Sequence, residues 1–131
     1  MQKYGKQIRR VWRHYPLPFH QGADKTHQAS ECANEKGKFW EFHHAAFARQ
    51  AELTNPGVLD AIAAQIKLKE KDFKKCMESG KYADRVQADI QKGSQVGVRG
   101  TPMFYINGAP LSGARPIDQF IPVIEEALKK K

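Results

Sequence analysis

Several kinds of segment are missing from this 131-residue sequence. No apolar run approaches the roughly 20 residues that a membrane-spanning helix needs, and residues 2–13 are too polar and basic for the hydrophobic part of a secretory signal. Internal repeats and low-complexity linkers are also absent. With 40% hydrophobic and 27% charged residues, the chain has the composition of one globular domain. We expect no stable membrane insertion.

Cysteine is scarce, which limits the sites that the chain can build. Cys32 and Cys76 are the two cysteines, and their separation matches neither a CxxC pair nor a metal-binding pattern. They are either two buried thiols or one long-range crosslink, and for an isolated pair two buried thiols are the commoner outcome. The sequence alone leaves both alternatives open.

Histidine is present five times, but without a metal-binding spacing. Neither His-x3-His nor HExxH occurs. His43 and His44 are adjacent on a predicted helix and point to different sides, while His14, His20 and His27 fall in a predicted strand, a loop and a helix. We therefore predict no metal site and no cofactor.

Acidic residues are outnumbered by basic ones, 14 to 22, which gives a formal charge of +8. A basic chain suggests a nucleic-acid partner. The positive residues are spread over the sequence, however, and the densest runs, residues 67–75 and 129–131, lie on predicted helices. Aromatic residues do not alternate with basic ones as in RNA-binding motifs. We expect a solvated basic surface and no nucleic-acid partner.

The most informative stretch is residues 98–108. Pro102 precedes four large apolar residues, 103–106, which predict a buried strand with the proline at its entrance. Asn107-Gly108 favours a two-residue hairpin turn, so residues 109–112 are predicted to form the returning strand. A helix over 116–129 follows, and Pro122 inside it should kink it or delay its start.

The rest of the chain predicts one strand and then a helical block. Residues 8–15 are rich in β-branched and aromatic side chains and end at a proline, which indicates a strand. Apolar spacing, glycines and caps then predict five helices. These helices are expected over residues 23–36, 38–50, 57–67, 70–79 and 81–94. Phe39, Trp40, Phe42 and Phe47 are expected to form core; a peptide groove lined by some of them is the less favoured alternative.

Three segments and the closing helix resemble the DsbA-like thiol–disulfide oxidoreductases. The segments are VWRHYPLPFH, ECANEKGKFWEFHHAAF and FKKCMESGKYADRVQADIQKGSQVGVRGTPMFYING. The resemblance covers nearly all of the chain and implies an α/β, thioredoxin-like (DsbA-type) fold with an inserted all-helical subdomain. It assigns residues 1–22 and 97–131 to the thioredoxin-like sheet and final helix, and residues 23–96 to the helical insertion, within one partial domain.

The resemblance also implies a functional loop at Arg99, Gly100, Thr101 and Pro102. In the family this loop contains a cis-proline, faces the redox-active CxxC and pairs with an extended substrate segment. Thr101 is the residue expected to contact both the substrate backbone and the catalytic thiol. The implied partners are protein or peptide thiols and disulfides together with a redox partner protein, and the implied location is periplasmic or otherwise extracytoplasmic.

One feature of the family is missing from the sequence. In the family a central strand and the helix that carries CxxC precede the segment with which this chain begins. We therefore expect a chain truncated at the N-terminus, with no catalytic residue of its own and inactive alone. Local repacking, a domain-swapped homodimer or a second chain would fill the gap. The alternative is a complete, non-catalytic relative that binds peptides or a partner.

Cys32 and Cys76 match positions at which some family members carry a second, non-catalytic disulfide. The resemblance thus implies a structural bond between them. By the loop-closure relation such a bond would contribute roughly 3–4 kcal/mol, and it is typical of an oxidising compartment.

Overall fold

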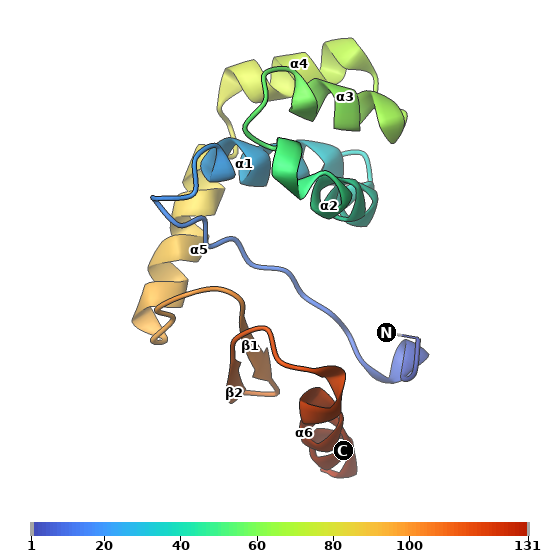
Figure 1. Cartoon of the computed structure of the whole chain (residues 1–131), viewed down its shortest axis with the longest axis vertical. Helices are drawn as coiled ribbons and strands as arrows, with labels where there is room; N and C mark the ends of the chain where they lie inside the picture. The colour runs from blue at the N-terminus through green and yellow to red at the C-terminus, as the bar shows by residue number, and fades with distance from the viewer. Residues whose placement is uncertain (1, 131) are drawn as a thin grey trace. The chain divides into compact units, whose positions relative to one another are not determined.

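The computed structural model describes residues 2–130, and Figure 1 shows the course of the chain. The chain consists of two compact units. Unit 1 comprises Met1–Arg13 and Gly93–Lys131, and unit 2 comprises His14–Lys92. The predicted domain assignment has other boundaries, with a helical insertion over residues 23–96, and it stays a prediction. Within residues 2–130, no helix is both long and apolar enough to cross a membrane.

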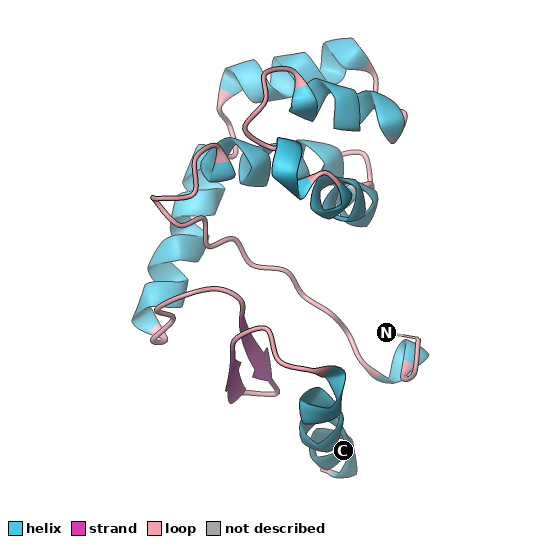
Figure 2. Cartoon of the chain, viewed as in Figure 1, coloured by secondary structure: helices cyan, strands magenta, loops and turns pink. Residues whose placement is uncertain are grey.

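Unit 2 is helical, as Figure 2 shows. Its helices are α1 (Ala23–Asn34), α2 (Phe39–Ala48), α3 (Val58–Gln65), α4 (Glu70–Ser79) and α5 (Ala83–Gln95), with a 3-10 turn at Gln50–Glu52 and the end of α5 continuing into unit 1. All five predicted helices are confirmed, and α4 has the predicted bounds. Glycines mark three helix ends: Gly22 and Gly57 precede α1 and α3, and Gly80 follows α4, each with the positive φ that glycine adopts readily.

The core of unit 2 lies among α1 to α4. Small residues on α1 allow close packing, and the largest core side chains are Phe42, Ile62 and Phe73. Because these three come from α2, α3 and α4, the apolar faces of separate short helices are buried against one another, which stabilises helices too short to be stable alone. Val86 of α5 is also fully buried.

Unit 1 contains the sheet and the last helix. Strand β1 (Met103–Ile106) pairs antiparallel with β2 (Ala109–Ser112), with Met103 opposite Ser112 and Ile106 opposite Ala109. Both turn residues, Asn107 and Gly108, have positive φ, of 49° and 89°, as a type I′ turn requires. The bounds and turn of the predicted hairpin are therefore confirmed residue for residue. The expected burial of its first strand is wrong, since Phe104 and Tyr105 are 40% and 43% exposed.

Helix α6 (Ile117–Lys129) and a 3-10 turn at Gly5–Gln7 complete unit 1. Phe120 of α6 packs edge-to-face against Phe104 of β1, with ring centroids 4.8 Å apart. The Tyr4 hydroxyl donates a hydrogen bond to Glu125 Oε1 of α6 at 2.9 Å. Tyr4 is the one buried residue in the described part of unit 1, so this unit has little core of its own.

Two further sequence-based expectations are wrong: the core position of Phe47, which is 55% exposed, and the strand over residues 8–15. Residues 8–15 form no strand: the segment is irregular, and Val11 is 56% exposed. A strand needs a hydrogen-bonded neighbour, and in residues 2–130 the sheet consists of β1 and β2 alone. Of the two effects expected of Pro122, a kink or a delayed start, the delayed start does not occur, since α6 begins at Ile117. Its first turn forms with Gln119 N donating to Pro116 O at 3.0 Å.

Candidate functional site

The loop between α5 and β1 is anchored at both of its ends. At the end of α5, Val98 N donates to Gly93 O at 2.9 Å, and Gly97 adopts a φ of 92° that lets the chain leave the helix. At the start of β1, Gly113 N donates to Pro102 O at 2.9 Å. The Tyr105 hydroxyl bonds to Val96 O at 3.0 Å, so the strand also holds the first part of the loop.

The middle of this loop is open to solvent. Arg99, Gly100, Thr101 and Pro102 are all exposed, and the peptide bond between Thr101 and Pro102 is cis. The structure thus brings the four predicted site residues together on one anchored, exposed turn within unit 1. Their part in substrate binding stays a prediction.

The two cysteines form a disulfide bond between α1 and α4. Cys32 and Cys76 have their Cα atoms 6.0 Å apart and are joined through their sulfurs. Both lie in the core of unit 2, and Cys32 Sγ is 3.7 Å from Met77 Sδ. Neither cysteine is free. Because the bond is buried among apolar groups, its chemistry is that of a structural crosslink.

A partly buried polar cluster, which the sequence did not predict, joins the start of unit 2 to α1 and α5. His14 and Glu31 are its buried members. His14 is 1% exposed. Its Nε2 lies 2.9 Å from Glu31 Oε1, and its Nδ1 lies 2.9 Å from His27 Nδ1. Its backbone N–H donates to Asp89 Oδ2 at 3.0 Å. Glu31 Oε2 is in turn 3.2 Å from the Arg85 Nε. We call these five residues the His14 cluster.

The surroundings of His27 shift its pKa in both directions, with a net lowering. The pKa of His27 is lowered to about 4, first by burial and then by the neighbouring His14. The carboxylates of Asp24 and Asp89 act against this lowering because they favour the charged imidazole. Among the described residues, no three His, Cys, Asp or Glu side chains are arranged to hold a metal ion. The cluster is joined by hydrogen bonds and by the ion pair between Glu31 and Arg85.

Sequence reasoning missed the His14 cluster because it treated the histidines one by one. One signal was available: His27 and Glu31 are four residues apart on a predicted helix and therefore share a face. Nothing local indicated that His14, 13 residues before His27, would meet that face. A buried polar pair of this kind depends on the path of the loop between them.

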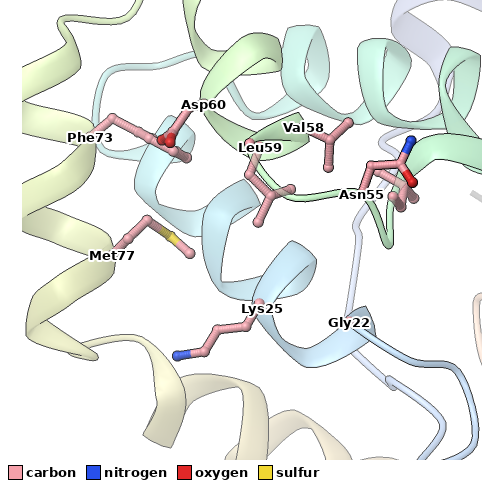
Figure 3. A pocket seen from close by; sticks show the side chains of 10 residues that line it. Gly22, Lys25, Asn55, Val58, Leu59, Asp60, Phe73 and Met77 are labelled. Atoms are coloured by element: carbon pink, nitrogen blue, oxygen red, sulfur yellow. The ribbon is translucent and has the colours of Figure 1, made fainter.

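A shallow pocket of about 250 Å³ lies in unit 2 (Figure 3). Leu59, Phe73 and Met77 supply apolar surface from α3 and α4, and Lys25 and Asp60 supply opposite charges. The residues that line the pocket include no Ser, Thr, Cys or His, and Lys25 and Asp60 are its two titratable residues. It is open to solvent and gives no indication of a specific ligand.

Comparison with known proteins places the chain in a family. The model of the family described as DSBA-like thioredoxin domain matches residues 1–125. The chain belongs to the DSBA-like thioredoxin domain family. The helices and the small antiparallel sheet of this DSBA-like domain are thus those of an α/β, thioredoxin-like fold. No solved structure matches the chain.

Curated relatives of this DSBA-like domain are much longer proteins. It is 33% identical over 121 residues to a protein of Salinispora arenicola named Na(+)/H(+) antiporter NhaA 1, a match that covers 92% of the domain and 18% of that protein. Identity is 36% over 102 residues to the NhaA 3 antiporter of Salinispora tropica, with 77% and 16% covered. A similar NhaA antiporter of Nitrosospira multiformis is 34% identical over 112 residues, with 85% and 18% covered. The chain spans less than a fifth of each of these relatives.

Proposed function

We propose that this chain is the substrate-facing part of a protein that exchanges disulfides with extended segments of other proteins. Membership of the DSBA-like family over residues 1–125 supports this proposal most directly. The exposed turn at Arg99–Pro102, anchored at both ends, is the surface that would contact the substrate. A fixed, exposed loop suits recognition of an extended peptide, because the peptide backbone can pair with it.

The reacting dithiol in this proposal comes from outside the 131 residues. They contain no CxxC, and both cysteines are held in the buried Cys32–Cys76 bond. In the exchange, one thiolate attacks a substrate disulfide and forms a mixed disulfide, releasing one substrate thiolate. The second thiol then displaces the other substrate sulfur. The dithiol is oxidised by two electrons and the substrate is reduced; the opposite direction uses the same steps in reverse. By itself the 131-residue chain would not catalyse this exchange.

The proposed setting is an oxidising, extracytoplasmic compartment. A disulfide such as Cys32–Cys76 persists there, whereas most reducing compartments would keep the thiols free. The partners would be protein thiols or disulfides and a redox protein that regenerates the dithiol. The edge of β1 that does not face β2 is where a strand of another chain or a second copy would pair.

A second candidate is a non-catalytic module that binds peptides or a partner. Two observations favour it. The 131 residues lack a CxxC pair, and the curated relatives are named for an ion-transport activity rather than for disulfide exchange. In this case the Arg99–Pro102 turn would bind an extended segment without any transfer of electrons.

Both candidates require the turn to bind peptide, which can be tested by NMR. An extended peptide with an alkylated cysteine at its centre is titrated into the 15N-labelled chain, and we expect saturable shifts of the Gly100 and Thr101 amides. A Cβ at Gly100 would meet nothing within 4 Å, so Gly100→Val should block binding without disturbing the fold. Ala114→Val, at an exposed position of unit 1, is the matched control. Absence of saturable shifts in the unmodified chain would reject the peptide-binding role.

Insulin reduction with dithiothreitol tests where the dithiol resides. The 131-residue chain is expected to leave the rate of insulin precipitation at the background value. Catalytic acceleration that survives removal of trace contaminants would show that the proposed division of the active site is wrong.

A further inference from the structure

His14 is fixed by three contacts that come from two different helices. Its backbone N–H donates to Asp89 of α5, and its two ring nitrogens meet His27 and Glu31 of α1. Because His14 is fully buried, water does not easily replace a contact that is lost. The position of the chain at the start of unit 2 therefore depends on these hydrogen bonds.

The contact between the two imidazoles limits how many protons they can carry. At 2.9 Å, the two Nδ1 atoms are at hydrogen-bond distance, and such a bond holds one hydrogen, donated by one ring and accepted by the other. A neutral pair satisfies this condition, and so does a pair with one extra proton. If both rings become imidazolium, each Nδ1 carries a hydrogen, and two positive charges and two hydrogens face each other.

We propose that His14 and His27 form an acid-sensitive latch, which fixes the start of unit 2 to α1 and α5 and releases it when both imidazoles are protonated.

The charged groups around the pair favour one added proton and oppose a second. Glu31 of α1 contacts His14 directly, and Arg85 of α5 contacts the other oxygen of Glu31. The Nε2 atom of His14 thus faces a carboxylate oxygen of Glu31. Asp24 of α1 and Asp89 of α5 favour a charge on His27, but its burial outweighs them.

Tyr82, at the edge of the cluster, also interacts with the charges of Glu31 and Arg85. Burial, together with the hydrogen bond from its hydroxyl to Glu35, raises the pKa of Tyr82 to about 12. Tyr82 therefore stays neutral throughout the acid range and does not take part in the release.

The pH range of the release follows from the two states of His27. Its pKa is about 4 in the folded protein and 6.5 for an ordinary histidine. Between these values the unfolded or released chain binds more protons than the closed cluster, so the closed form loses stability as the pH falls. We expect the latch to be closed above pH 6.5 and to open as the pH falls toward 4.

The test compares the wild-type chain with His27→Asn. The asparagine amide can still bond to His14 but cannot be protonated. Hydrogen exchange of the His14 amide is measured from pH 7.5 to 3.5 and corrected for the intrinsic exchange rate. Protection of the His14 amide in the wild type should fall by about tenfold or more as the pH drops below 6.5. A difference of one pKa unit between the closed and the released state corresponds to a change of about tenfold in proton affinity. In His27→Asn that fall should be absent. His44→Asn, at an exposed position on α2, should behave like the wild type.

Two results would overturn the latch. One is the same loss of protection in His27→Asn as in the wild type, and the other is unchanged wild-type protection down to pH 4. If His27→Asn does not fold, NMR titration of the His27 ring in the wild-type chain decides the question. A pKa well below 6.5, with the His14 amide shifting over the same pH range, supports the latch. A pKa at or above 6.5 refutes it.

Discussion

Breaking the Cys32–Cys76 disulfide should cost unit 2 a large part of its stability. The bond closes a loop with a sequence separation of 44 residues. In the loop-closure relation, a loop of this length lowers the entropy of the unfolded chain enough to contribute about 4 kcal/mol at 25 °C. Since a domain is commonly stable by only about 5–15 kcal/mol, reduction should bring unit 2 close to unfolding.

Reduction measures this contribution more cleanly than substitution does. Both cysteines are buried in the core, so replacing them by alanine would remove sulfur atoms and leave a cavity with its own cost. Reduction leaves the number of core atoms unchanged apart from the two added hydrogens. The difference in free energy of unfolding between oxidised and reduced protein then reflects mainly the crosslink.

The assay is urea denaturation followed by tryptophan fluorescence. Trp40 lies on α2, in unit 2, and Trp12 lies in unit 1, so a Trp12→Phe background assigns the signal to unit 2. We expect the reduced chain to lose about 4 kcal/mol and to show a larger m-value, since its unfolded state is more expanded. The Cys32→Ala/Cys76→Ala double variant is the control, and its unfolding should not respond to reductant.

The reasoning would fail if reduction lowered the free energy of unfolding by less than about 1 kcal/mol with an unchanged m-value. The unfolded chain would then be restricted already, by residual structure that brings α1 and α4 together without the covalent bond.

Three further substitutions test the core, the turn and the anchoring of α6. Ile62→Ala should lower the free energy of unfolding in urea by about 2–5 kcal/mol because Ile62 is fully buried, whereas Ile117→Ala, at a residue 71% exposed, should change it by less than about 0.5 kcal/mol. Gly108→Ala should destabilise the hairpin by about 1 kcal/mol, because φ at this position is +89°, which is unfavourable for alanine. The loss should appear as faster amide exchange in β1 and β2, and unchanged exchange would contradict the prediction. Tyr4→Phe removes the hydrogen bond to Glu125 and should weaken the anchoring of α6. We expect amide exchange in α6 to become a few times faster. Exchange equal to that of the wild type would contradict this prediction.

The features that the sequence predicted correctly are those determined by neighbouring residues. The hairpin follows from Asn107-Gly108, whose positive φ values define the turn and hence the register. Helix α4 follows from its apolar spacing and from Gly80, which ends it. In each case a few consecutive residues contain the physical cause.

The features that it did not predict depend on distant partners. The side chains of residues 8–15 favour a strand, but a strand exists only where another strand bonds to it, and composition cannot supply one. The pairing of His14 with His27 likewise depends on the course of the loop between them. For the Arg99–Pro102 turn, the sequence indicated the location, and the hydrogen bond from Gly113 N to Pro102 O that anchors it could be found only in the structure.

The disulfide also changes the connectivity of the molecule. Residues 32–76 form a closed covalent ring that contains all of α2 and α3 and most of α4, and the remaining residues are two tails attached to it. A protease that cuts once inside this ring, for example in the exposed turn at residues 54–57, leaves a single molecule with its mass increased by one water. Such a nick is invisible on a non-reducing gel and yields two fragments on a reducing one.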